Sequence, residues 1–360
     1  MPSFDAVPEQ HEAKRLLTAA LAEGPAHAYL FHGPAGTGKR RAAFAFAAAL
    51  LGEERRVLER AHPDLYVLEA LGEMIRIDEI RELRRDLHMR PFEAQRRVYL
   101  ILNAHLLNED AADALLKDLE EPPSYAVIVL VADELGPLPP TIRSRCQPVA
   151  FRRLSEKAVR EWLAAEAPGL GATEATALAR VAAGRLDRAL RLLDADAAVR
   201  RAALLAVARG TYLDPEFEPV DAAAVLLESS GARGAKAKED EERKLEGREL
   251  TGRELEQRLK RAQRGAEREE LLASLEELAA WYRDLVVAGA GAEGAVVHAD
   301  RLEELRADAT AERLAAAGEA AETVRDAWRS LEELNLNPQL ALESLFIRLR
   351  RQLAGAGAAI

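Results

Sequence analysis

An apolar run, a glycine-rich loop and an alanine-rich run follow one another directly near the start of the chain. Residues 28–31 are apolar and end just before Gly33, as expected of a buried parallel strand. The loop reads GPAGTGKR over residues 33–40, and residues 42–51 have the composition of a helix. A strand, a glycine loop and a helix in this order direct backbone N–H groups and a helix N-terminus at an anion. The order therefore predicts a phosphate-binding loop in an α/β domain.

The loop departs from the usual phosphate-binding pattern at its last position. Its spacing fits G-x-x-x-x-G-K-[ST], but Arg40 stands where a hydroxyl would ligate Mg²⁺. A guanidinium has five donors, no acceptor and a permanent positive charge, so it cannot replace that ligand. The loop keeps the means to cradle phosphate but lacks a usual means of holding the metal. The residues of this degenerate nucleotide site are Gly33, Gly36, Gly38, Lys39 and Arg40.

The strand that should supply a metal-binding carboxylate also lacks it. A P-loop ATPase needs an acidic residue at the end of a neighbouring strand to hold Mg²⁺, and a following Glu often polarises the attacking water. The matching strand, residues 98–101, is followed by Leu102 and Asn103. Leu102 cannot ligate a metal, and Asn103 cannot accept a proton as a carboxylate does. Together with Arg40, these two departures predict that ATP hydrolysis has been lost.

The chain divides into an α/β part and a helical part. Residues 1–152 alternate strand and helix patterns, which predicts a mostly parallel sheet covered on both faces. Residues 153–197 fit a three-helix lid that starts at Ser155, a good N-cap. Residues 198–360 have further helical patterns, which predicts an all-α C-terminal domain. A charged insertion at about 231–269 is poor in apolar residues, and we expect a solvated helix or a mobile segment there.

Composition narrows the class of protein. The chain has 50 Lys and Arg against 61 Asp and Glu, and this formal charge of −11 argues against a protein that coats nucleic acid by itself. The single cysteine, Cys146, excludes an internal disulfide and a thiolate zinc cluster. No basic-then-apolar leader opens the chain, and no apolar run approaches 18 residues. We therefore expect a cytoplasmic protein that does not contact a membrane.

Several stretches together resemble the AAA+ subunits of the bacterial sliding-clamp loader. They are the phosphate-binding loop, HAYLFHG (27–33), AHPDL (61–65), IDEIREL (77–83), NEDAADALLKDLEEPP (108–123) and TIRSRC (141–146). The resemblance covers residues 1 to about 195 closely and the C-terminal helices more loosely. It implies an AAA+ P-loop domain, a helical lid and a C-terminal collar through which subunits assemble into an oligomer.

Under this resemblance, the motif formed by Ser144, Arg145 and Cys146 carries the main function. In the family, the arginine of this motif reaches the ATP held by the adjacent motor subunit, so Arg145 is expected to act in trans as an arginine finger. The alternative is an ordinary surface arginine at the start of a strand. Arg188 resembles the sensor arginine of the lid, with a role that is structural once the metal site is lost.

The damaged nucleotide motifs resemble those of the clamp-loader subunit that does not hydrolyse ATP within DNA polymerase III. The implied partners in DNA replication are the tau/gamma ATPase subunits and the delta subunit, with the sliding clamp and primer–template DNA contacted through the complex. No cofactor is required, and weak ATP or ADP binding is allowed. The family's four-cysteine zinc module is missing at residues 51–60, so neither zinc nor another metal is expected. The alternative is an ATP-hydrolysing motor subunit of the tau/gamma type.

Overall fold

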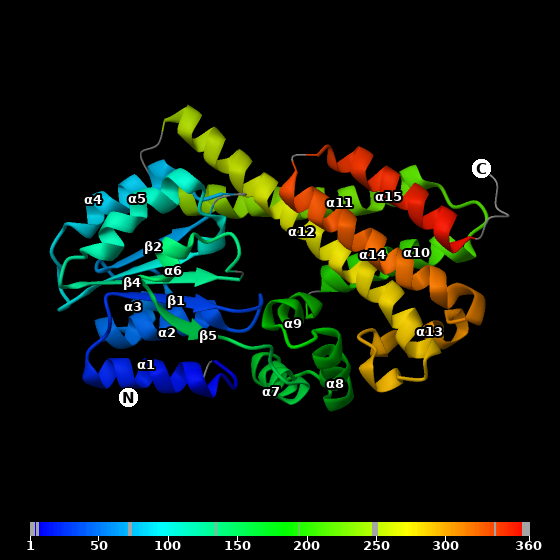
Figure 1. Ribbon diagram of the computed structural model, residues 1–360, viewed down its shortest axis with the longest axis horizontal. Helices are drawn as coiled ribbons and strands as arrows, with labels where there is room; N and C mark the ends of the chain where they lie inside the picture. Colours follow the sequence, from blue (N-terminus) through cyan, green and yellow to red (C-terminus); the bar gives the residue numbers. More distant parts are fainter. Residues whose placement is uncertain are drawn as a thin grey trace. The chain divides into compact units, whose positions relative to one another are not determined.

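The computed structural model describes two compact units (Figure 1). Unit 1 comprises Met1–Leu170 and Ala183–Arg188, and unit 2 comprises Gly171–Ala182 and Ala189–Ile360. The side chains of residues 195, 197, 254 and 333 are not described. The described residues are 4, 7–70, 74–133, 135–193, 195–246, 251–334 and 336–354.

Unit 1 is built on a five-stranded parallel sheet of order β2-β3-β4-β1-β5. Its central strands β3 and β4 are buried along their whole length, as expected of a sheet that helices cover on both faces. The parallel sheet predicted from the sequence is confirmed. The strands are β1 (Ala28–His32), β2 (Leu65–Glu69), β3 (Arg97–Leu102), β4 (Ala126–Ala132) and β5 (Gln147–Ala150).

Alternate residues of β3 belong to two separate cores. Val98 and Leu100 pack with α1 (His11–Glu23) and α2 (Lys39–Leu51), whereas Tyr99 packs with α4 (Ile77–Leu87) and α5 (Glu109–Glu120). Figure 1 shows these two helix pairs on opposite faces of the sheet. Successive side chains of a strand point to opposite faces of the sheet, and this alternation produces the two cores. Because the strands are parallel, their carboxyl ends lie along one edge of the sheet, where a site can form. The short helices of this part are α3 (Glu54–Leu58), η1 (Ala104–Leu106) and α6 (Pro140–Arg143).

Three helices follow the sheet, as predicted for residues 153–197. They are α7 (Glu156–Glu166), α8 (Ala172–Val181) and α9 (Leu186–Leu192). The Ser155 Oγ accepts the backbone N–H of Ala158 at 3.1 Å, so the predicted N-cap is confirmed. The boundary between the two units falls within this segment. The lid and collar boundaries given above stay predictions.

Unit 2 is helical throughout its described residues, in agreement with the predicted all-α region. Its core is formed by large side chains such as Trp281, Tyr282 and Phe346, all buried. The charged insertion 231–269 forms the end of one long helix and the start of the next, with residues 247–250 outside the described part. The elements are α10 (Ala195–Leu213), α11 (Pro219–Leu245), α12 (Gly252–Gly289), η2 (Glu293–Ala295), η3 (Ala299–Arg301), α13 (Leu302–Asp308), α14 (Ala311–Glu333) and α15 (Pro338–Leu353).

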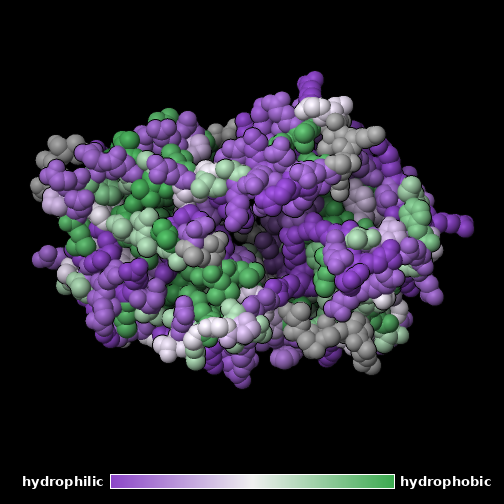
Figure 2. Space-filling model, turned by 180° about the vertical axis from the view of Figure 1, so that it is seen from behind, coloured by the Kyte–Doolittle hydropathy of each residue, from purple (hydrophilic) through white to green (hydrophobic). Residues whose placement is uncertain are grey.

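The face shown in Figure 2 is mainly hydrophilic. On the face shown in Figure 2, hydrophobic residues reach the surface in patches between larger hydrophilic areas. None of the described helices combines the length and the apolar character that a membrane span requires.

A buried carboxylate organises the loop that precedes β3. Asp64 is fully buried, and its carboxylate accepts the backbone N–H groups of Phe92, Glu93 and Ala94 at 2.7, 2.9 and 2.8 Å. Burial raises the pKa of Asp64, but these hydrogen bonds and the nearby Arg97 outweigh it and hold the pKa below its ordinary value. Asp64 therefore fixes this loop against the end of the sheet.

We predict that Asp64→Ala lowers the free energy of unfolding by about 3 kcal/mol, because three backbone donors lose their acceptor and the buried Arg97 loses a nearby carboxylate. The stabilisation is present above the ordinary aspartate pKa of about 4 and is lost as the pH falls through the depressed native value. Urea unfolding at pH 7 measures the effect. Asp113→Ala, on the exposed side of α5, is the control and should change stability little.

Candidate functional site

The lysine of the phosphate-binding loop is fully occupied by groups of its own chain. Lys39 begins α2, and its side chain is only 3% exposed. Its Nζ donates to the carbonyl oxygens of Gly33 and Pro34, both at 2.6 Å, and pairs with Asp133 Oδ1 at 2.7 Å. Burial lowers the pKa of Lys39, although Asp133 opposes the shift. An ammonium has three N–H donors, so a phosphate must displace one of these partners to reach it.

The segment that leads into α9 lies directly on the loop. The backbone N–H of Leu186 donates to the Gly36 carbonyl at 2.8 Å. A Cβ at Gly36 would lie 1.8 Å from Asp187 Oδ1, and Gly36 has a φ of 70°, so two independent constraints require glycine there. Arg185 holds the Asp187 carboxylate with bonds of 3.2 and 2.8 Å. A carboxylate therefore rests against the loop that the sequence predicts to bind phosphate.

Arg40 has an ion-pair partner at the end of β2. Its guanidinium makes two hydrogen bonds to the Glu69 carboxylate, of which the Nη2–Oε2 bond is 3.0 Å long. Arg60 Nη2 donates to the same carboxylate at 2.9 Å. Burial raises the pKa of Glu69, but Arg40 and Arg60 outweigh it and hold the pKa below its ordinary value. Arg40 thus fills the hydroxyl position of the motif with a cation that is already paired with a carboxylate.

The end of β3 contains no carboxylate. Leu102 is buried in the core, and Asn103 follows with a φ of 57°, in the left-handed region. The carboxylate nearest to the loop lysine comes instead from Asp133, directly after β4. His105 Nδ1 accepts the backbone N–H of Asp133 at 3.2 Å. Sequence reasoning missed Asp133, although a carboxylate directly after a continuous apolar strand was a usable signal.

Arg145 lies at the surface between α6 and β5. Its Nη1 donates to the Thr141 carbonyl at 2.8 Å, and its Nη2 pairs with Glu120 at the end of α5. The side chain is 31% exposed, and a partly exposed pair of this kind contributes only about 0–1 kcal/mol. Arg145 can therefore exchange Glu120 for another anion at low cost.

The two neighbours of Arg145 have structural contacts. Ser144 Oγ donates to the Thr141 carbonyl at 3.0 Å, at the end of α6. Cys146 is buried in the core, and burial raises the pKa of its thiol to about 12. Because Cys146 anchors the chain immediately after Arg145, the backbone of the arginine is held in place.

The predicted lid sensor, Arg188, is half-buried in α9. The residue of this segment that lies against the loop is Asp187, one position earlier. A sensor role for Arg188 stays a prediction.

His62, named above within the AHPDL stretch, is buried, and its Nδ1 accepts the backbone N–H of Asp64 at 3.1 Å.

The described residues contain no group of three or more His, Cys, Asp or Glu side chains that could hold a metal ion.

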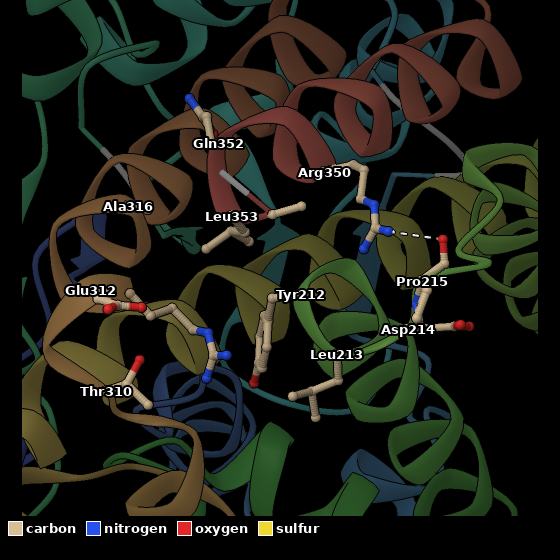
Figure 3. A pocket seen from close by; sticks show the side chains of 12 residues that line it. Tyr212, Leu213, Asp214, Pro215, Thr310, Glu312, Ala316, Arg350, Gln352 and Leu353 are labelled. Atoms are coloured by element: carbon tan, nitrogen blue, oxygen red, sulfur yellow. Dashed lines mark hydrogen bonds between the residues drawn. The ribbon is translucent and has the colours of Figure 1, made fainter. Parts of the chain in front are cut away.

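Unit 2 holds a separate pocket of about 390 Å³ between the end of α10 and parts of α14 and α15 (Figure 3). Arg313 lies 4.3 Å above the Tyr212 ring in this pocket, and Arg350 donates to the Thr211 and Pro215 carbonyls. None of the predicted site residues lines it.

The family model that matches this chain covers residues that lie within unit 1. The family model described as DNA polymerase III, delta subunit, matches residues 9–155. DNA polymerase III subunit tau of Bacillus subtilis is 36% identical over 168 residues, which are 43% of this chain and 30% of that protein. DNA polymerase III subunit delta' of Pseudomonas aeruginosa is 37% identical over 158 residues, 40% of this chain and 48% of that protein. The chain thus spans less than half the length of these relatives.

A solved structure also aligns along most of the chain. It is a DNA polymerase III, gamma subunit-related protein from Thermotoga maritima, with a TM-score of 0.43 and 18% sequence identity. The alignment covers 94% of this chain and 98% of that one.

Proposed function

We propose that this chain is a delta-prime subunit of the DNA polymerase III clamp loader that hydrolyses no ATP itself, in line with its similarity to subunits of that polymerase. In this role it supplies Arg145 in trans to the ATP site of a neighbouring ATPase subunit while a sliding clamp is loaded during DNA replication. The observation that carries the proposal is the loop lysine, whose three donors are all used by Gly33, Pro34 and Asp133.

The absence of hydrolysis follows from the chemistry of the remaining positions. Phosphoryl transfer to water needs Mg²⁺ on the phosphates and a group that orients the attacking water. Arg40 offers no lone pair, Leu102 is buried and apolar, and Asn103 is no proton acceptor. The carboxylates of Asp133 and Asp187 further disfavour a polyphosphate by repulsion. The chain requires no cofactor or zinc for this role, and at most weak ATP or ADP binding is left.

The role in trans rests on the position of Arg145. A guanidinium on a neighbour's γ-phosphate stabilises the charge of the transition state. Arg145 is partly exposed and weakly paired, and the buried Cys146 holds its backbone. The partners in this role are the tau/gamma ATPase subunits and the delta subunit, with the helices of unit 2 forming the chain's share of a collar. The clamp and primer–template DNA are contacted through the complex.

A second candidate is an ATP-hydrolysing subunit of the tau/gamma type. The similarity to the Bacillus subtilis tau subunit fits this reading as well as the delta-prime one. Asp133 is the observation that favours it, because this carboxylate could turn to a metal ion if Lys39 moved to a bound phosphate.

A reconstituted complex can separate the two candidates. We predict that a complex containing this chain and ATPase subunits whose own P-loop lysines are replaced by alanine hydrolyses ATP only at background level. The same complex with Lys39→Ala in this chain should be indistinguishable from it. Turnover that persists in the first complex and disappears in the second would instead favour the motor subunit.

A further inference from the structure

The charged insertion, which has no part in the proposed function, folds as a helical hairpin. The hairpin consists of residues 231–246 at the end of α11 and residues 251–269 at the start of α12, which pack against each other. Leu245 and Leu259 are buried in it. Arg258 Nε pairs with Glu241 Oε1 of the other helix at 2.9 Å. These contacts fix which side of α12 faces α11.

The opposite side of α12 carries a row of cations. At 3.6 residues per turn, positions 253, 257, 260, 261 and 264 fall within about 100° of the helix circumference, opposite Leu259. They hold four cations and one glutamine, and no acid. We call these cations the basic stripe: Arg253, Lys260, Arg261 and Arg264.

Most of the basic stripe has no partner among the residues that the structure describes. Lys260 pairs with Glu256 at 2.6 Å, whereas Arg253, Arg261 and Arg264 make no side-chain hydrogen bond or ion pair with any described residue. Other arginines of unit 2 have carboxylate partners, such as Arg201 with Glu277 and Arg209 with Asp308. In a chain with eleven more acidic than basic residues, a row of arginines that has no partner among the described residues is a local reversal of charge.

We propose that the basic stripe binds the phosphate backbone of a nucleic acid. Its four cations span twelve residues, a rise of about 16 Å along the helix, which is close to one charge per 4–5 Å. A DNA strand presents one phosphate per 3.4 Å or so, a comparable density. Three of the four cations are arginines, whose planar donors suit phosphate oxygens. Such contacts fix position without reading sequence, and they do not depend on Arg145.

The test measures binding of the purified full chain to a fluorescein-labelled DNA duplex of about 30 base pairs by anisotropy, between about 50 and 200 mM salt. With three to four phosphate contacts, the slope of log K against log salt should be about −3. The variant with Arg253→Gln, Arg261→Gln and Arg264→Gln should bind at least roughly tenfold more weakly at 50 mM salt, with a slope near zero. Arg264→Gln alone should reduce the slope by about one.

A matched control removes the same charge from another surface. Arg325, Arg329 and Arg348 are exposed on α14 and α15, and replacing all three by Gln should leave the slope unchanged. Equal slopes for the stripe variant and the wild type, or no salt-dependent binding by the wild type, would overturn the proposal. A stripe variant that keeps its DNA affinity but loses co-purification with clamp-loader subunits would also overturn it, in favour of an acidic protein partner.

Discussion

Under the proposed role in trans, replacing Arg145 by alanine or lysine should leave this chain folded and assembled but slow ATP hydrolysis at the one site of the ring that faces it. A guanidinium on the γ-phosphate contributes roughly 10³–10⁵ in rate in well-studied cases. Lysine should not restore the rate of ATP hydrolysis, because a point charge cannot reproduce the bidentate contact of a guanidinium. Total ATP turnover should fall in part, since other sites keep their own arginines, whereas productive clamp loading should fall more.

The measurement is DNA- and clamp-stimulated ATPase activity of the reconstituted complex, together with a clamp-loading assay. Arg143→Ala is the matched control, because Arg143 is exposed on α6 two residues before Arg145 and carries the same charge. Clamp loading at the wild-type rate by the Arg145→Ala complex would leave Arg145 a structural residue paired with Glu120.

A second large effect is expected from opening the phosphate-binding loop. Asp133→Asn combined with Asp187→Ala should release Lys39 and remove two negative charges next to the phosphate position. At about 5 Å and an effective dielectric constant of about 20, each carboxylate repels a unit negative charge by about 3 kcal/mol. ATP affinity should therefore rise by more than roughly tenfold per substitution, while hydrolysis stays absent.

Isothermal titration with ATP checks this gain. Asp113→Ala, which removes an exposed carboxylate on α5, should change nothing. Adding Lys39→Ala to the double variant should abolish the gain. An affinity that is the same in the wild type and the double variant would mean that Asp133 and Asp187 do not keep nucleotide out.

The local features of the site could be predicted from the sequence. Two examples are the strand that ends before Gly33 and the loss of metal ligands at Arg40 and Leu102. Each of these predictions uses only residues that are neighbours of the position concerned in the chain. The N-cap at Ser155 is equally local, and the structure confirms it. Local propensity, spacing and side-chain chemistry were sufficient for these features.

The partners of the loop could not be predicted in the same way. Asp187 meets Gly36 across 151 residues, and Glu69 meets Arg40 across 29, so both pairings depend on the tertiary fold. The sequence predicts a solvated helix or a mobile segment at 231–269, but not a helical hairpin, because Glu241 and Arg258 are both charged and neither indicates burial. Side-chain type alone does not reveal a contact made at long range.

The central claim is that this chain hydrolyses no ATP. Steady-state ATPase activity of the purified chain with Mg²⁺ and ATP, measured beside Lys39→Ala, tests it most directly. We predict equal rates for the two proteins, both at background, with and without an added ATPase subunit that carries an alanine at its own P-loop lysine. Mg²⁺-dependent turnover by the wild-type chain that vanishes in Lys39→Ala would contradict the claim and identify an active motor subunit.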